Sequence, residues 1–193
     1  MNTTTLPPQL TLNINLTDEE FFQLCQNNRD LRFERTAAGE LIIMPPTGSD
    51  TGNRNFDIAV ELGIWNKQTK LGKGFDSSTG FKLSNGKDVS PDVAWIKKER
   101  WHSLTPEQQN KFAPIAPDFV IELRSASDNL KLLQEKMQEY IANGVKLAWL
   151  IDRKQRKVFI YRPNCAVEEL DNPQTLTGEN ILPGFVLDLS EIW

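Results

Sequence analysis

Hydrophobic and polar residues follow two periods along this chain. Short apolar runs rich in β-branched and aromatic residues predict strands. These runs lie at 31–34, 40–44, 81–83, 90–96, 119–123, 147–151, 157–161 and 182–187. Longer stretches with an apolar face at helical spacing predict helices. Those stretches lie at 49–70 and 125–143, whereas a capping pattern predicts a helix at 17–27 and a short helix is expected at 106–112. The order of helices and strands indicates a mixed α/β layer fold.

Local signals define several element ends. Thr17 with Glu20, and Ser125 with Asp128, have the spacing of a capping box at a helix start. Gly39 marks the turn of the first hairpin. Residues 1–14 are rich in Thr, Pro and Asn and predict a loose arm or an edge strand. The helix at 49–70 has an approximate apolar stripe, formed by Phe56, Ala59, Val60, Leu62, Gly63 and Trp65.

Composition narrows the class of protein. A chain of 193 residues with 39% hydrophobic and 25% charged residues is typical of one globular domain, and we expect residues 1–193 to form it. The net charge of −4 argues against indiscriminate coating of nucleic acid. No apolar stretch is long enough to cross a membrane, and the N-terminus lacks signal-peptide features. Cys25 and Cys165 stand alone, which favours reduced thiols in the cytoplasm.

Two acidic residues, Asp92 and Glu122, stand inside apolar runs that predict buried strands. A carboxylate there is costly unless a cation, a metal ion or hydrogen bonds hold it. We therefore expect the two to lie on neighbouring strands and to share a divalent metal ion. Because His102 is the single histidine, most zinc sites are excluded, and an oxygen-bound Mg²⁺ or Mn²⁺ is the expected ion.

Side-chain alternation adds two cationic candidates. Successive strand residues point to opposite faces, so Glu122 and Arg124 should project to the same side. The alternative is that these two pair with each other on a solvated edge. Lys136 lies on the flank of the apolar arc of the next helix and can aim its ammonium toward the strand ends. The alternative for Lys136 is a lysine that extends to solvent at a helix boundary.

For Asp92 and Glu34, a structural explanation is an alternative to a role in the site. Pro91 fixes the entry into the strand and places Asp92 well, although a Pro-Asp pair alone is typical of a turn. Glu34, in the first hairpin strand, is a further candidate acid. For Glu34, however, we favour the alternative of an edge-strand glutamate that faces water.

A family resemblance supports the choice of Asp92 and Glu122. Pro91-Asp92 followed by Glu122-Leu123-Arg124 resembles the Pro-Asp…(Asp/Glu)-x-Lys signature of restriction-endonuclease-like nucleases. The surrounding segments are similar to one branch, the Uma-type family of endonucleases, over roughly residues 17–190. The segments that carry this similarity lie at 33–46, 90–94, 120–128, 136–144 and 149–152.

The resemblance implies a restriction-endonuclease-like core, a central mixed sheet flanked by helices, and a metal-dependent endonuclease acting on DNA. Asp92 and Glu122 would bind Mg²⁺ or Mn²⁺. Arg124 occupies the third signature position, where arginine can stabilise charge but cannot act as a base. Lys136 would supply the missing ammonium, to orient or deprotonate water. The competing hypothesis is an inactive nucleic-acid-binding or assembly module with the same fold. A homodimer would suit the nuclease, because one site cuts one strand.

Overall fold

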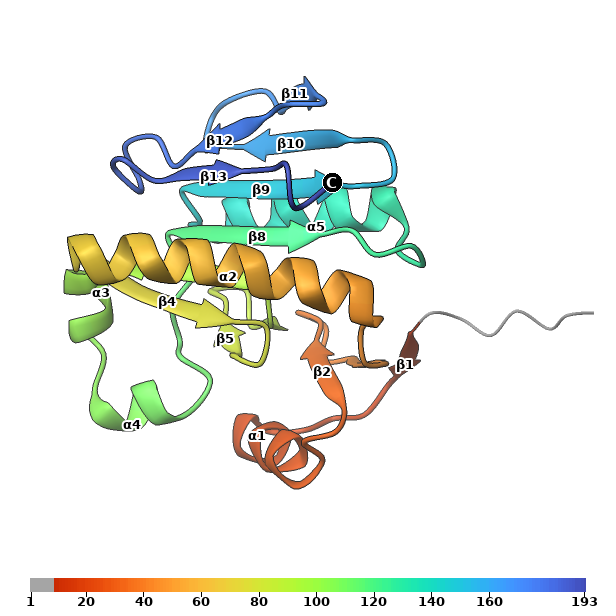
Figure 1. Cartoon of the computed structure of the whole chain (residues 1–193). Helices are drawn as coiled ribbons and strands as arrows, with labels where there is room; N and C mark the ends of the chain where they lie inside the picture. The colour runs from red at the N-terminus through yellow and green to blue at the C-terminus, as the bar shows by residue number, and fades with distance from the viewer. Residues whose placement is uncertain (1–8) are drawn as a thin grey trace, which may run out of the picture.

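The computed structural model describes residues 9–193, and the first part of the predicted N-terminal arm lies outside them. A six-stranded sheet forms the centre of the molecule (Figure 1). Its strands are β4 (Gly72–Asp76), β7 (Val93–Lys97), β8 (Phe119–Leu123), β9 (Leu147–Asp152), β10 (Lys157–Tyr161) and β11 (Glu168–Asp171). Their order across the sheet is β11-β10-β9-β8-β7-β4. Strands β8 and β9 are parallel and the other neighbours are antiparallel, which confirms the predicted mixed sheet.

Two helices cover opposite faces of this sheet (Figure 1). They are α2 (Ser49–Thr69) and α5 (Leu130–Ala142). Side chains of β8 alternate between the two faces, as a strand period of two requires. Ile121 packs in the cluster that contains Leu62 of α2, and Val120 packs in the cluster that contains Met137 of α5. The apolar strand is therefore covered on both sides, and the predicted layered α/β class is confirmed.

A second sheet has five strands in the order β1-β3-β2-β6-β5. These are β1 (Leu10–Leu12), β2 (Arg32–Arg35), β3 (Leu41–Met44), β5 (Phe81–Lys82) and β6 (Asp88–Val89). The hairpin of β2 and β3 turns at Gly39, whose φ of 89° suits glycine. Of the two predictions for the N-terminal segment, the edge strand is correct for β1, which pairs with β3 alone. A loose arm is wrong for these three residues.

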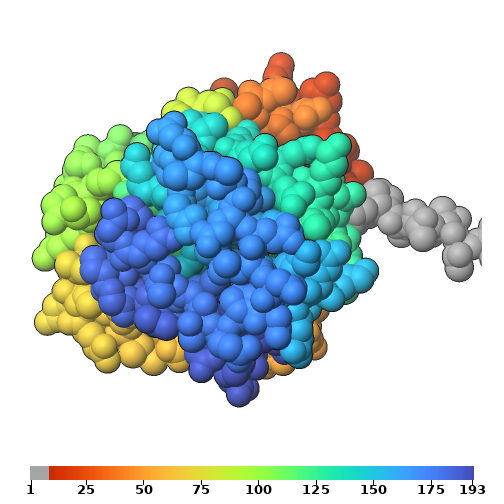
Figure 2. Space-filling view, turned by 90° about the horizontal axis from the view of Figure 1, so that it is seen from above, coloured from red at the N-terminus to blue at the C-terminus, as the bar shows by residue number. Residues whose placement is uncertain are grey.

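The remaining elements surround the two sheets. They are α1 (Asp18–Asn27), α3 (Lys98–His102), α4 (Pro106–Asn110), β12 (Thr175–Thr177) and β13 (Val186–Asp188). The β12–β13 hairpin shares the α2 side of the central sheet, where Trp65 Nε1 donates to the Pro183 carbonyl at 3.1 Å. Seen from above, blue C-terminal segments cover much of the molecule (Figure 2). Within residues 9–193, no helix is long and apolar enough to cross a bilayer.

Two helix predictions need correction, although the Thr17–Glu20 capping box at α1 is confirmed. Helix α5 begins later than predicted, because the side chain of Asn129 caps it by accepting from the Lys131 and Leu132 amides. The apolar stripe predicted for α2 is partly wrong. Its buried residues are Thr51, Asn55, Ile58, Leu62 and Trp65. Phe56 and Val60 instead face outward, with 66% and 38% of their surface exposed.

Candidate active site

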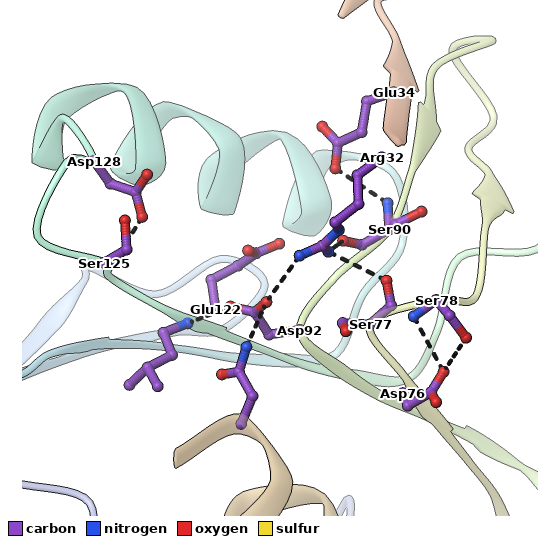
Figure 3. Close-up of polar contacts among 12 residues, drawn as sticks. Arg32, Glu34, Asp76, Ser77, Ser78, Ser90, Asp92, Glu122, Ser125 and Asp128 are labelled. Atoms are coloured by element: carbon purple, nitrogen blue, oxygen red, sulfur yellow. Dashed lines mark hydrogen bonds and ion pairs between the residues drawn. The ribbon is translucent and has the colours of Figure 1, made fainter. Parts of the chain in front are cut away.

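Asp92 and Glu122 lie close together (Figure 3): Glu122 belongs to β8, and Asp92 immediately precedes β7, the strand that pairs with β8. Strands β7 and β8 pair Ala94 with Val120 and Val93 with Ile121, and one further step in this register brings Asp92 to Glu122. Residues directly opposite in an antiparallel pair share one face of the sheet. The backbone connects them too, because the amide next to Glu122, that of Leu123, donates to Asp92 Oδ2 at 2.9 Å. The two carboxyl groups thus lie side by side.

Two side chains contact Asp92 in addition to the Leu123 amide of β8. Asn55 Nδ2, from α2, donates to Asp92 Oδ1 at 3.0 Å. The guanidinium of Arg32 lies 3.8 Å from the same oxygen. Burial raises the pKa of Asp92, and the Leu123 amide, Arg32, Lys136 and Asn55 oppose that effect without cancelling it. The negative charge on Asp92 is therefore only partly compensated.

Glu122 is buried against α5. Its Oε1 atom accepts a hydrogen bond from the Tyr140 hydroxyl at 2.8 Å and lies 2.9 Å from the Lys136 ammonium. Burial raises the pKa of Glu122 to about 7. Lys136 opposes this effect, and the nearby carboxylates of Asp92 and Glu34 add to it. Glu122 thus changes its charge close to neutral pH, unlike an exposed glutamate.

Lys136 connects Glu122 to Glu34. Its ammonium lies 2.8 Å from Glu34 Oε1 and 2.9 Å from Glu122 Oε1, and only 16% of its side chain is exposed. Lys136 therefore points inward, and the alternative of extension to solvent is wrong. Burial lowers the pKa of Lys136, but the two carboxylates outweigh it and the net pKa is raised. A protonated ammonium can orient a water molecule, but it cannot accept a proton, so the predicted base role is not supported.

The favoured alternative for Glu34 is wrong. Strand β2 lies between β3 and β6 rather than at an edge, and Glu34 is buried, with 5% of its surface exposed. Its Oε1 atom also accepts from the Ser90 amide at 3.1 Å. Burial raises the pKa of Glu34, but the charge and hydrogen bond of Lys136 outweigh burial, and the net pKa is lowered. Glu34 is therefore a charged member of the cluster.

Arg124 lies apart from these residues. Its Nη1 atom lies 2.6 Å from Asp152 Oδ2, at the end of β9, and its Nε donates to the Asp128 carbonyl at 3.2 Å. Glu122 and Arg124 do not pair with each other, so the solvated-edge alternative is wrong. The Arg124 guanidinium is instead paired with Asp152, which is fully buried. The sequence prediction placed Arg124 beside Asp92 and Glu122. In the structure Arg124 contacts neither of these two carboxylates.

Sequence reasoning missed three residues of the cluster. Tyr140 follows Lys136 by four residues, so the helical period places both on one face of α5, and this spacing was a usable signal. Asn55 is a polar residue on the buried line of α2, which also could have marked it. Arg32 gave no local signal, because its position depends on contacts with Ser77 and Ser90, which are distant in sequence.

The cluster carries more negative than positive side chains, so a bound cation would improve its charge balance. Glu34, Asp92 and Glu122 bring three carboxylates, whereas Lys136 and Arg32 bring two cations. Asn55 Oδ1 is buried and accepts no hydrogen bond within the described part of the chain. That part contains no group of three or more His, Cys, Asp or Glu side chains able to hold a metal ion. Two carboxylates nevertheless fit Mg²⁺, which proteins often bind through one or two carboxylates with water completing the shell.

The fold and this cluster together define a class. A mixed sheet with two neighbouring buried carboxylates and a buried lysine beside them matches what the resemblance to restriction-endonuclease-like nucleases implied. The model of the Uma2 family, described as "Putative restriction endonuclease", matches residues 18–190, and the chain belongs to this family.

A solved structure supports the same fold. It is a crystal structure from Anabaena variabilis ATCC 29413, described as "a putative nuclease belonging to DUF820". The two chains share 19% identity with a TM-score of 0.74, and the alignment covers 92% of this chain and 97% of that one. No curated protein matches this sequence.

Proposed function

We propose that this protein is a Mg²⁺- or Mn²⁺-dependent endonuclease that hydrolyses phosphodiester bonds in DNA. The observation that carries the proposal is the proximity of Asp92, which accepts from the Leu123 amide just before β7, to Glu122 on β8, with the Lys136 ammonium beside Glu122. Membership of the family described as "Putative restriction endonuclease", and the likeness to a structure described as "a putative nuclease", support DNA as the substrate.

Asp92 and Glu122 would hold the metal ion. A divalent ion bound there supplies a Lewis acid and lowers the pKa of water. The residues fit this task because burial raises the pKa of both carboxyl groups, so a second positive charge stabilises their ionised forms. Asn55 fixes the orientation of Asp92, and Tyr140 fixes that of Glu122.

Two cationic side chains would act on the phosphate and the water. Hydrolysis forms a bond from a water oxygen to phosphorus and breaks one phosphorus–oxygen ester bond, while negative charge grows on the phosphate oxygens. Lys136, held by Glu34, would orient the water and stabilise that charge. Arg32 has 30% of its side chain exposed beside Asp92, and it would contact the phosphate.

Relaxation of supercoiled plasmid in the presence of Mn²⁺ tests this proposal. We expect nicking by the wild type, and a loss of at least about a hundredfold in Asp92→Asn, as for removal of a transition-state contact worth about 3 kcal/mol. Asp188→Asn, at an exposed aspartate of β13, is the matched control and should nick normally. A wild type that binds DNA without nicking it would support the binding or assembly module instead.

A further inference from the structure

The side-chain amide of Asn55, on α2, has one atom with a partner and one without. Its Nδ2 donates to Asp92 Oδ1 at 3.0 Å, whereas its Oδ1 is buried and accepts no hydrogen bond from the described part of the chain. Within residues 9–193, the other buried side-chain atoms that lack a partner are all nitrogens, and Asn55 Oδ1 is the only oxygen. A buried acceptor without a donor destabilises a fold, so a group that binds this oxygen is expected.

The neighbouring carboxylate determines which way the Asn55 amide faces. Ionised Asp92 can only accept hydrogen bonds, so the NH2 group of Asn55 must face Asp92. Turning the amide over would place its oxygen against a carboxylate oxygen. The two terminal atoms of an amide are about 2.2 Å apart, which keeps Asn55 Oδ1 within about 5 Å of Asp92 Oδ1. The acceptor without a partner is therefore fixed beside the carboxylate.

A second buried atom without a partner belongs to a neighbour of Asp92. Arg32 places Nη1 3.8 Å from Asp92 Oδ1, and the Nε atom of the same guanidinium is buried and makes no hydrogen bond within the described residues (Figure 3). Arg32 Nε is a donor, whereas Asn55 Oδ1 is an acceptor. The surroundings of Asp92 thus offer one atom to an anion and another to a cation, as binding of a phosphate together with a metal ion requires.

Helix α2 carries Asn55 to this position on its buried line. The line includes Ile58 and Leu62, which pack in the core against the central sheet, and Asn55 has 9% of its surface exposed. An apolar side chain at position 55 would continue this packing without burying a polar group. Packing therefore does not explain an asparagine here, whereas a role beside Asp92 does.

We propose that Asn55 Oδ1 is a third protein ligand of the divalent ion bound by Asp92 and Glu122, an inference that rests on the proposed function. Carbonyl and carboxylate oxygens are the ligands that suit Mg²⁺ and Mn²⁺. The ligands come from three elements, because Asn55 belongs to α2, Asp92 immediately precedes β7 and Glu122 belongs to β8. Two carboxylates balance the two charges of the ion, and a neutral amide adds a bond without adding charge.

The alternative is that Asn55 only positions Asp92. In that case Nδ2 performs the whole role of the side chain, and Oδ1 meets an ordinary water molecule. The two roles depend on different atoms of one amide, so substitutions that remove them separately can distinguish the two.

Calorimetric titration of Asn55 variants with Mn²⁺ makes this distinction. Asn55→Leu is similar in size but has no ligand oxygen, and we expect it to bind Mn²⁺ about tenfold more weakly than the wild type, or worse. Asn55→Asp loses the donor to Asp92 but keeps a ligand oxygen, now charged, and should bind at least as tightly as the wild type. Thr51→Val, one turn earlier on the same buried line, is the matched control and should bind like the wild type.

Each contrary result has a separate meaning. Binding by Asn55→Leu that equals the wild type would overturn the proposal, as would a loss in Asn55→Asp as large as that in Asn55→Leu. Both results would leave the metal site of Asp92 and Glu122 intact. A wild type that binds no Mn²⁺ would instead remove the metal site, and with it both the proposed function and this inference.

Cadmium tests the direct contact independently of whether Asn55→Leu folds. In a Cys25→Ser, Cys165→Ser background, Asn55→Cys places a soft thiolate where the amide lies. Adding Cd²⁺ should then produce an ultraviolet sulfur-to-metal charge-transfer band that saturates at about one ion per chain. Adding Asp92→Asn should remove the band, and Thr51→Cys should not show it. Absence of the band in Asn55→Cys, or a band that survives Asp92→Asn, would show that position 55 does not share an ion with Asp92.

Discussion

Lys136 Nζ lies 2.9 Å from Glu122 Oε1, between two strands that belong to different sheets. The ammonium reaches Glu122 on β8 of the central sheet and Glu34 on β2 of the second sheet. One cation therefore pairs with two buried carboxylates that are 88 residues apart in sequence. This shared pairing is the basis for the following predictions on stability and activity.

Lys136→Met should destabilise the protein and abolish nicking. Removing the ammonium leaves Glu34 and Glu122 buried without their common partner, which costs about 3 kcal/mol when both are charged. Urea denaturation at pH 8 measures this loss, and plasmid relaxation measures activity. Lys131→Met, on the same helix with 84% of its side chain exposed, should match the wild type in both assays. Equal stability of the two variants would show that the Lys136 contacts are energetically unimportant.

Glu122→Gln should change the pH dependence of the metal-free protein. The pKa of Glu122 is about 7 in the folded state against 4.5 for an ordinary glutamate, so the unfolded chain loses this proton first as pH rises. Wild-type stability should therefore fall between about pH 4.5 and pH 7, by on the order of 3 kcal/mol from this group. Glu122→Gln lacks this fall and should exceed the wild type in stability at pH 8.

Urea denaturation in EDTA at pH 5 and pH 8 measures that difference. The wild type and Glu122→Gln share every other titrating group, so subtracting their two slopes isolates Glu122. A Glu122→Gln protein that is less stable than the wild type at pH 8 would mean that the Lys136 pair outweighs the cost of burial. The assignment of a raised pKa to Glu122 would then be wrong.

Glu34→Gln should have the opposite pH dependence. Lys136 outweighs burial and lowers the pKa of Glu34, so the charged form stabilises the fold above the ordinary glutamate pKa and this contribution is lost as pH falls. We expect a loss of about 2 kcal/mol at pH 7 and a smaller loss at pH 4, because the stabilisation disappears only as pH falls through the lowered pKa of Glu34. Urea denaturation at both pH values checks this, with Glu61→Gln, at an exposed glutamate of α2, as control. An equal loss at both pH values would indicate a packing effect instead.

Comparing Arg124→Met with Arg124→Lys should show whether Arg124 stabilises the fold or acts on the substrate. Arg124→Met leaves the fully buried Asp152 unpaired and should cost about 3 kcal/mol in urea denaturation. Arg124→Lys keeps the charge and should retain plasmid nicking within about threefold, because the structure gives Arg124 no contact with the cluster. If Arg124→Lys folds with wild-type stability yet fails to nick, Arg124 acts on the substrate as the sequence signature implies.

Much of the fold is readable from periodicity. The run at 119–123 alternates so that Glu122 and Val120 share a face, and the structure places both toward α5. The helix predicted at 49–70 is confirmed, but the prediction of which side chains it buries is partly wrong. Its sequence contains apolar residues on two opposite lines, and a helical period alone does not say which line meets the sheet. The line with Ile58 packs inside, and the line with Val60 remains exposed.

The parts of the site that could not be predicted depend on distant pairings. Glu34 is buried because β6 pairs with β2, and β6 is a two-residue strand too short to show a period. Arg124 meets Asp152 because β8 and β9 run parallel in a register that the sequence alone does not specify. The helix start moved from Ser125 to Asn129 because Asp128 instead accepts from the Ser125 amide and closes a turn before the helix.

Calorimetric titration with Mn²⁺ tests most directly whether Asp92 and Glu122 bind one divalent ion together. We expect about one ion per wild-type chain, and at least a tenfold loss of affinity in both Asp92→Asn and Glu122→Gln, with Asp188→Asn unchanged. Either no binding to the wild type, or binding that survives both Asp92→Asn and Glu122→Gln, would contradict a shared metal site.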